Sequence, residues 1–189
     1  MWQGEFGEAY TKRNRVDWRT RVDGFAAMLG GVPVGSALEV GCNRGHNLVA
    51  LRSLGWQAKG VEPQPYARGL AQRGMLDVQP GSVYEIPFGD ASFDLVFTSG
   101  VLIHVPPGRL HEAMRELARV SRRYLLAVEY HSPVDERIVY RGHDDLLWKR
   151  DYGAHYLAAV PGLEVVRSGV APSGFEQVDT WWLLEKAVI

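Results

Sequence analysis

The chain has 189 residues, and its 21 lysines and arginines nearly balance 22 aspartates and glutamates, which leaves a formal net charge of −1 at pH 7. This balance argues against nucleic acid and against a membrane surface as the main partner, because both favour concentrated positive charge. The single cysteine, Cys42, excludes an intramolecular disulfide and indicates a reducing compartment. A chain of this length fits one domain. Residues 1–14 lack the apolar core of a signal peptide, so we expect the protein to be cytoplasmic.

The spacing of apolar residues predicts alternating helices and strands in the first half of the chain. The first helix has an apolar face that consists of Trp18, Val22, Phe25 and Leu29. A strand at 37–40, a helix that ends at Gly55 and a strand at 58–61 follow in this order. A proline-started helix then ends at Gly74, and a third strand is expected at 76–79.

The second half continues this alternation and then changes character. A buried strand is predicted at 93–98, a helix after Pro106 and Pro107, and a strand at 124–129. The apolar face of that helix consists of Leu110, Ala113, Met114, Leu117 and Val120. Alternation of this kind predicts a parallel sheet with helices on both faces. The tail has two β-rich runs, 163–168 and 178–185, which are too close for a crossover helix and should pair antiparallel.

A glycine-containing turn follows the first predicted strand. Glu39 lies near the end of that strand, and Gly41, Asn43 and Gly45 lead into the next helix. The free N–H groups and positive dipole end of a helix N-terminus favour a nucleotide-type ligand at such a junction. The pattern differs from the Gly-x-Gly-x-x-Gly of dinucleotide folds, where an acid at this place would repel a pyrophosphate.

A second acid completes the predicted cofactor site. Glu62 follows the second strand about 20 residues after Gly41, where a carboxylate can accept both hydroxyl groups of a ribose. Glu39 suits a positively charged amino group. An adenosyl ligand that carries an amino acid therefore fits both acids.

With these residues the chain resembles the class I S-adenosylmethionine-dependent methyltransferases, as do the runs GSVYEIPF at 81–88 and SFDLVF at 92–97. More narrowly, it is similar to the small methylases associated with pseudaminic acid biosynthesis. The matching stretches are GEFGEAYTKRN at 4–14, GCNRGHNL at 41–48, TSGVLIHV at 98–105, EY at 129–130, YRGH at 140–143, KRD at 149–151 and WWLLEK at 181–186. Asn43 departs from the broader pattern in place of a glycine, and Ser82 stands where an acid often contacts adenine.

The resemblance implies an α/β, Rossmann-like, doubly wound sheet in a single methyltransferase domain over 1–189. Seven mostly parallel strands are expected in the order 3-2-1-4-5-7-6, with one antiparallel strand near the C-terminus. Residues 1–31 are the expected N-terminal lid region. The implied cofactor is S-adenosylmethionine, with S-adenosylhomocysteine as its product. The implied cofactor-binding residues are Tyr10, Arg13, Glu39, Gly41, Cys42, Asn43, Gly45, Asn47, Glu62, Pro63, Ser82, Val83, Ser99, Gly100 and Val101.

Methyl transfer from a sulfonium needs an aligned nucleophile, and a hydroxyl nucleophile also needs a base. His104 lies just past the fourth predicted strand and is the first candidate for that base. The other catalytic candidates are Glu129 and His131, at the end of the fifth strand. Residues 132–152 are the expected substrate segment, because their aromatic and cationic side chains suit an anionic acceptor. The predicted substrate-binding residues are Tyr130, Tyr140, Arg141, His143, Trp148, Lys149 and Arg150.

The leading hypothesis is a methyltransferase that acts on a small, anionic sugar or amino-acid derivative, with O-methylation slightly favoured. N-methylation of a small amine and a non-catalytic cofactor-binding module in a biosynthetic complex are the alternatives. A nicotinamide oxidoreductase is disfavoured by the missing glycine pattern. We expect no metal, since the histidines and acids lack ligand spacing, no nucleic acid and no membrane partner, and a monomer or homodimer.

Overall fold

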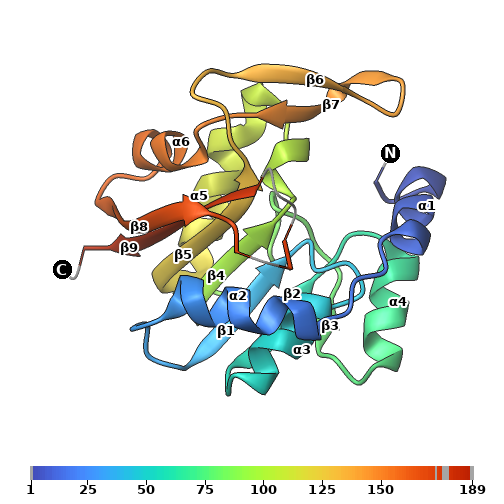
Figure 1. Ribbon diagram of the computed structural model, residues 1–189, viewed down its shortest axis with the longest axis horizontal. Helices are drawn as coiled ribbons and strands as arrows, with labels where there is room; N and C mark the ends of the chain where they lie inside the picture. The colour runs from blue at the N-terminus through green and yellow to red at the C-terminus, as the bar shows by residue number, and fades with distance from the viewer. Residues whose placement is uncertain (1, 173, 176–178, 188–189) are drawn as a thin grey trace.

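The computed structural model describes residues 2–172, 174–175 and 179–187. A seven-stranded sheet with the order β3-β2-β1-β4-β5-β9-β8 forms the centre of the protein (Figure 1). The strands are β1 (Ser36–Val40), β2 (Gln57–Val61), β3 (Val78–Gln79), β4 (Phe93–Ser99), β5 (Ser121–Tyr130), β8 (Leu163–Val170) and β9 (Asp179–Lys186).

The strand order confirms the predicted 3-2-1-4-5-7-6, where the sixth and seventh strands of the sheet are β8 and β9. β1 to β5 pair in parallel, and β9 pairs antiparallel with both β5 and β8. The predicted last strand, 178–185, corresponds to β9, and its first residue lies outside the described residues. Because β1 to β5 are parallel, their carboxyl ends meet at one edge, where ligands bind in sheets of this kind.

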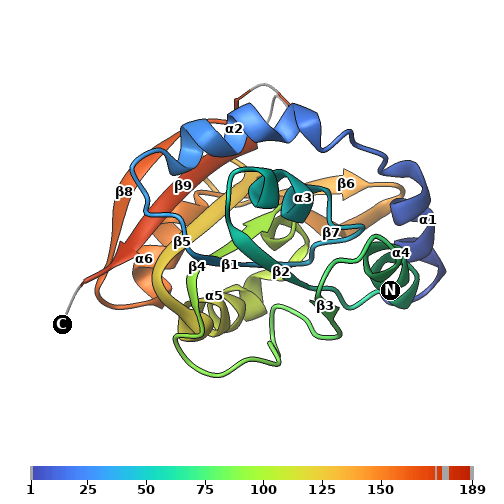
Figure 2. The same cartoon turned by 90° about the horizontal axis from the view of Figure 1, so that it is seen from below.

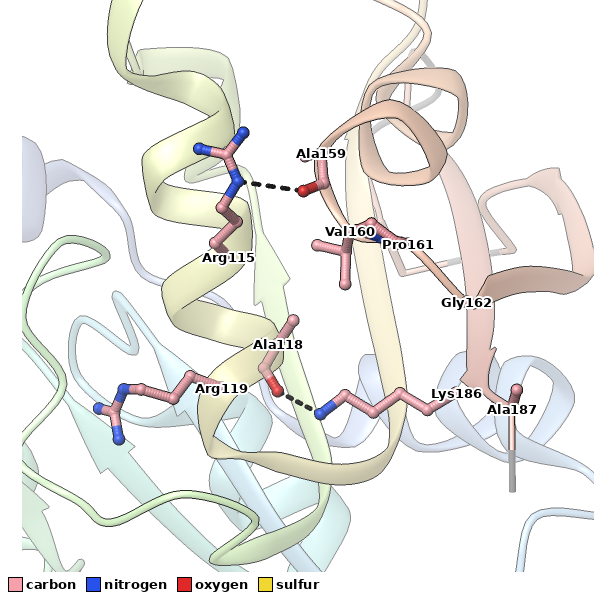
Figure 3. A pocket seen from close by; sticks show the side chains of 9 residues that line it. All are labelled: Arg115, Ala118, Arg119, Ala159, Val160, Pro161, Gly162, Lys186 and Ala187. Carbon is pink, nitrogen blue, oxygen red and sulfur yellow. Dashed lines mark hydrogen bonds between the residues drawn. The ribbon is translucent and has the colours of Figure 1, made fainter. Parts of the chain in front are cut away.

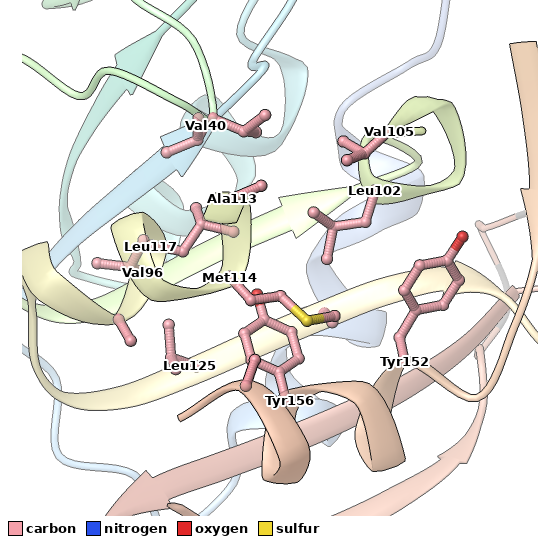
Figure 4. Close-up of a cluster of buried hydrophobic side chains, with 14 of the residues drawn as sticks. Val40, Val96, Leu102, Val105, Ala113, Met114, Leu117, Leu125, Tyr152 and Tyr156 are labelled. Atoms are coloured by element: carbon pink, nitrogen blue, oxygen red, sulfur yellow. The ribbon is translucent and has the colours of Figure 1, made fainter. Parts of the chain in front are cut away.

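Two layers of helices cover the two faces of the sheet (Figure 2). One apolar cluster joins the sheet to α2 and α3, and a second joins it to α5 and α6. The predicted apolar face of α5 is buried against the sheet, together with Tyr152 and Tyr156 of α6 (Figure 4). The helices are α1 (Glu5–Arg13), α2 (Arg19–Leu29), α3 (His46–Ser53), α4 (Pro65–Arg73), α5 (Leu110–Val120) and α6 (Tyr152–Ala159), with 3₁₀ turns η1 (Leu102–His104) and η2 (Pro107–Arg109).

A β-hairpin occupies most of the segment that the sequence predicted only as a substrate-binding stretch. β6 (Glu136–Tyr140) and β7 (His143–Lys149) pair antiparallel outside the main sheet. Arg141 and Gly142 join them with φ angles of 52° and 82°, the two positive values of a type I′ turn. The hairpin lies above the carboxyl edge of the sheet, and its turn points toward α1 (Figures 1 and 2). None of the described helices is long and apolar enough to cross a membrane.

Candidate functional site

The turn after β1 has the left-handed backbone that its sequence predicts. The φ angles of Gly41, Asn43 and Gly45 are 80°, 48° and 80°, so Asn43 adopts the conformation that the resemblance assigns to a glycine. The amides of Gly41 and Cys42 donate to the carbonyl of Val61, with N···O distances of 2.8 and 3.1 Å. These bonds fix the turn to the end of β2.

Replacing Gly45 with alanine should lower the free energy of unfolding by about 2–3 kcal/mol, because both strain and crowding oppose a side chain there. A Cβ atom at this position would lie 2.2 Å from Cδ1 of Leu76, on a backbone with positive φ. Gly108→Ala is the matched control, since a Cβ there would meet nothing within 4 Å. Equal urea-unfolding free energies for the two variants would contradict this account of the turn.

Glu39 is a buried acid with one oxygen ready for a ligand. Its side chain is 2% exposed, and Oε1 accepts a hydrogen bond from Nδ2 of Asn47 at 2.7 Å. Its Oε2 is buried and has no hydrogen-bond partner among the described residues. Burial raises the pKa of Glu39 to about 8, against the Asn47 hydrogen bond and the positive charge of Arg21, which both lower it. An ammonium group would supply the missing donor and favour the ionised carboxylate.

Glu62 lies at the end of β2, beside the same turn. Its Oε2 accepts from the amide of Asn43 at 2.7 Å, and its Oε1 accepts from the amide of Gln64 at 2.8 Å. Burial raises the pKa of this carboxyl, and the two amide hydrogen bonds lower it. Each carboxylate oxygen has further lone pairs, so Glu62 can still accept ribose hydroxyls. Neither acid is turned into solvent.

Gln64 connects Glu62 to the N-terminal segment. Its side-chain oxygen caps α4 by accepting from the amides of Tyr66 and Ala67. Its Nε2 donates to the carbonyl of Gly4 at 3.3 Å. The first turn of α1 is thereby attached to the loop that holds Glu62.

The predicted adenine contacts lie in a tight turn beyond β3. Ser82 pairs with Glu85 in an isolated antiparallel bridge, and its hydroxyl accepts from the amide of Tyr84 at 3.2 Å. The Val83 side chain is buried. The Ser82 hydroxyl is thus used within the turn, and Val83 offers an apolar surface.

Glu129 supports the loop after β4 from inside the protein. Its side chain is fully buried, and its carboxylate accepts from the amides of Val101 at 3.0 Å and Ile103 at 3.3 Å. Burial raises the pKa of Glu129 to about 7, although the hydrogen bonds to its carboxylate lower it. The preceding Gly100 has a φ of 65° and donates to the carbonyl of Val128. The carboxylate therefore shapes the rim of the site and does not reach its surface.

His104, in η1, has a defined tautomer. Its Nδ1 lies 2.6 Å from the carbonyl oxygen of Leu146 in β7. A carbonyl only accepts, so Nδ1 carries the proton and Nε2 keeps a free lone pair. Burial lowers the pKa of His104 to about 4, against the bond to Leu146, which raises it. His104 is neutral at pH 7 and has the form of a general base.

Aromatic rings from three segments surround His104, and we call them the ring cluster. The indole of Trp2 lies against the imidazole, with ring centroids 4.4 Å apart. The sequence analysis missed Trp2 and Phe6; Phe6 and Tyr10 are four residues apart on α1, and Trp2 lies in the turn before this helix. The ring cluster consists of Trp2, Phe6, Tyr10, His104, Tyr140 and His143.

Comparison with known proteins places this geometry in a family. A family model described as a methyltransferase domain matches residues 38–124, which contain the glycine turn, both acids and His104. These residues are therefore similar to methyltransferase domains over a little less than half of the chain. The match agrees with the predicted enzyme class, a methyltransferase. No curated protein sequence matches the chain.

Solved structures of methyltransferases share the whole fold of this chain at low sequence identity. A 1,6-didemethyltoxoflavin-N1-methyltransferase from Burkholderia thailandensis, bound to 1,6-didemethyltoxoflavin and S-adenosylhomocysteine, has a TM-score of 0.72 and 18% identity over 99% of this chain and 84% of that one. Magnesium protoporphyrin IX methyltransferase from Synechocystis PCC 6803, bound to S-adenosylhomocysteine, has a TM-score of 0.74 and 16% identity over 98% and 97%. The partner of the Trm112 methyltransferase activator in a complex from Haloferax volcanii has a TM-score of 0.76 and 18% identity over 100% and 98%.

Several of the predicted site residues lie apart from this site. The ring of His131 is exposed and lies 5.9 Å from that of Trp182, beside α6 and away from the ring cluster. Trp148 of β7 and Arg150 just after this strand are buried, and Arg150 donates to the carbonyl of Val105 at 3.0 Å. The remaining predicted residues fall into two groups: exposed Arg13 and Arg141, and partly buried Tyr130, Lys149, Pro63, Ser99 and Val101.

Arg21 is a residue that the sequence analysis did not consider. It lies on α2, and its positive charge lowers the pKa of both Glu39 and His46. Its guanidinium lies 4.1 Å from the centroid of the Phe175 ring. Arg21 is therefore a cation close to Glu39, while the predicted Arg13 lies exposed at the end of α1.

A hollow of ≈ 410 Å³ lies at the opposite end of the sheet (Figure 3). Its cations are engaged in structural bonds: Lys186 donates to the carbonyls of Ala118 and Ser121, and Arg115 donates to that of Ala159. Among the described residues, no group of three or more histidines, cysteines and acids could hold a metal ion.

Proposed function

We propose that this methyltransferase moves a methyl group from S-adenosylmethionine to an oxygen of a small, anionic metabolite. One arrangement carries the proposal: two buried acids flank the glycine turn after β1, and a neutral imidazole lies in the loop after β4. Structural neighbours that bind S-adenosylhomocysteine support it. The narrower resemblance to methylases of pseudaminic acid biosynthesis makes sugar and amino-acid derivatives the first acceptors to test.

The residues of the site fit the parts of this cofactor. The unpartnered oxygen of Glu39 suits the amino group of the methionine part, and the positive charge of Arg21 suits its carboxylate. Glu62 would accept the ribose hydroxyls, and Val83 would contact the adenine ring. When bound, the cofactor supplies an electrophilic methyl group on a positively charged sulfur.

The catalytic proposal assigns the proton to His104. As the acceptor oxygen bonds to the methyl carbon and the carbon–sulfur bond breaks, Nε2 of His104 takes the proton of the hydroxyl. With a hydroxyl acceptor the products would be a methyl ether, S-adenosylhomocysteine and a protonated imidazole that returns its proton to water; a carboxylate acceptor would give a methyl ester without a proton transfer to His104. Leu146 positions the ring through Nδ1, and Glu129 holds the loop that carries it. Such a base contributes roughly 10²–10⁴-fold to the rate.

Cofactor binding at pH 7 should release about one proton, because Glu39 is protonated in the free protein and ionised beside an ammonium. Its pKa of about 8 lies above pH 7, and the cation lowers it. Calorimetry with S-adenosylhomocysteine in buffers of different ionisation enthalpy measures this release. In Glu39→Gln the buffer dependence should vanish. Identical heats in all buffers for the unsubstituted protein would contradict the assignment of Glu39.

The reaction itself is tested by a mass-spectrometric screen with S-adenosylmethionine labelled in its methyl group. Hydroxylated sugars and amino-acid derivatives with a carboxylate are the primary acceptors, and small amines are the competing class. A labelled methyl ether or ester supports the proposal. A labelled amine as the preferred product would replace it with N-methylation. Cofactor binding without any turnover would favour the non-catalytic module.

Assembly is a separate part of the proposal. We propose that the protein is a monomer or a homodimer, since its nearly balanced charge does not favour a highly charged macromolecular partner. One structural neighbour forms a complex with the Trm112 methyltransferase activator. Light scattering of the purified protein distinguishes a monomer, a homodimer and larger assemblies.

A further inference from the structure

The ring cluster is unlike the apolar core, because all six of its rings are half-buried. A core cluster would exclude water from each ring, as it does from Phe25 and Phe97, which are 0% and 1% exposed. Large side chains that remain half-exposed and contiguous mark a binding surface more often than a structural one. Its position beside His104 places that surface where the acceptor must lie.

The cluster is assembled from the two sides of the site. α1 is attached at α4, where Gln64 binds Gly4 and a Cβ at Gly7 would lie 3.0 Å from the Gln64 side chain. The hairpin reaches the site from the side of β5. In both views the turn of the hairpin and the start of α1 lie next to each other. Phe6 meets Tyr140 and His143 across this boundary, at centroid distances of 6.3 and 5.8 Å.

Trp2 covers the imidazole of the proposed base. An acceptor must bring its nucleophilic atom to Nε2 of His104, so it has to share or take the place of the indole. The space beside the imidazole fits a flat aromatic ring, since the indole of Trp2 already lies there with its centroid 4.4 Å from that of the imidazole. The neighbouring rings stand nearly perpendicular to the indole, at 86° for both Phe6 and Tyr10. Faces and edges arranged in this way suit another planar aromatic ring.

A free cation lies at the outer edge of the cluster. The guanidinium of Arg141 lies 5.6 Å from the centroid of the Tyr140 ring. Among the described residues no acid forms an ion pair with Arg141, whereas Arg137 in the same hairpin lies 3.5 Å from Asp144. The positive φ of Arg141 in the two-residue turn holds its side chain at the tip of the hairpin.

From these observations we infer that the acceptor is an aromatic anion, whose ring packs against Trp2 and Phe6 while its carboxylate or phosphate binds Arg141. The inference rests on the proposed function and narrows its acceptor class, for example to aromatic amino-acid derivatives. Trp2 then determines specificity, and it acts by contacting the acceptor and not by proton transfer. The indole is displaced from His104 when the acceptor enters.

The test compares 4-hydroxybenzoate with 4-hydroxycyclohexanecarboxylate, two probes of similar size and charge of which only the first is flat and aromatic. Saturation-transfer NMR measures binding of each to the full-length protein, tagged at the C-terminus, in the presence of S-adenosylhomocysteine. We expect the aromatic probe to bind about tenfold more tightly. Trp2→Ala should remove this preference, and Trp2→Phe should retain most of it. Arg141→Gln should weaken both probes equally, because both carry the carboxylate.

Phe88→Ala is the control, since it removes a partly buried aromatic ring that packs against Phe93 at the start of β4, outside the ring cluster. Circular dichroism checks the fold of each variant. Equal binding of the two probes, or an unchanged preference in Trp2→Ala, would overturn the inference. Failure of the proposed function is seen separately, as loss of S-adenosylhomocysteine binding or absence of methyl transfer to any acceptor.

Discussion

Glu62→Ala should weaken S-adenosylhomocysteine binding by about 100-fold or more, the largest effect on affinity that we expect from one substitution. Two charge-assisted hydrogen bonds to the ribose are lost, each worth roughly 1.5–3 kcal/mol. The carboxylate also holds the amides of Asn43 and Gln64, so the turn and the loop beyond β2 lose their acceptor together. Isothermal calorimetry at micromolar protein concentration measures the change directly.

Two controls separate the ribose contact from a loss of folding. Glu62→Gln keeps one acceptor oxygen and should lie between the alanine variant and the unsubstituted protein. Glu164→Ala removes an exposed acid on the edge strand β8 and should leave affinity unchanged. Undiminished affinity in a folded Glu62→Ala protein would contradict the ribose assignment.

His104→Ala should lower kcat by roughly 10²–10⁴-fold while cofactor affinity stays within about twofold. The variant removes the lone pair of Nε2 but leaves the glycine turn and both acids in place. Added imidazole should restore part of the activity, because it can enter the space left by the buried ring. Equal loss of turnover and cofactor affinity would show that His104 serves only the structure.

The pH dependence of the same reaction follows from the low pKa of His104. Burial lowers that pKa to about 4, so the neutral, basic form is present above this value. With saturating cofactor and acceptor, kcat should therefore be independent of pH from about 6 to 8 and fall as the pH approaches 4. A rate that rises through pH 6.5, the ordinary range of histidine, would contradict a buried neutral base.

The sheet was predictable because most of its strands are apolar runs with turn residues at both ends. The hairpin was not, because β6 and β7 bury only Leu147 and Trp148 and thus lack a period of two. α6 was also missed, although Asp151 caps it by accepting from the amide of Ala154. The only sequence feature that indicated α6 was its capping residue, because this short helix has no long apolar face.

The candidate site was predictable in part, for a similar reason. Glu39 and Glu62 end buried strands, and their position alone places them at the carboxyl edge. Glu129 also ends a strand, but its side chain turns inward to the amides after β4, while Tyr130 is partly exposed. Sequence position gives the edge of the sheet, whereas the direction of each side chain follows from the alternation along the strand.

Gln64 links the proposed cofactor site to the N-terminal segment, and this link predicts the order in which the two substrates bind. The backbone amide of Gln64 donates to the carboxylate of Glu62, to which we assign the ribose. Its side-chain Nε2 donates to the carbonyl of Gly4, at the start of α1. If Glu62 binds the ribose as proposed, we expect the bound nucleoside to tighten the attachment of the N-terminal segment that contains Trp2. We expect a compulsory kinetic sequence in which the methyl donor enters first and the spent donor leaves last, so that the acceptor never meets an empty enzyme.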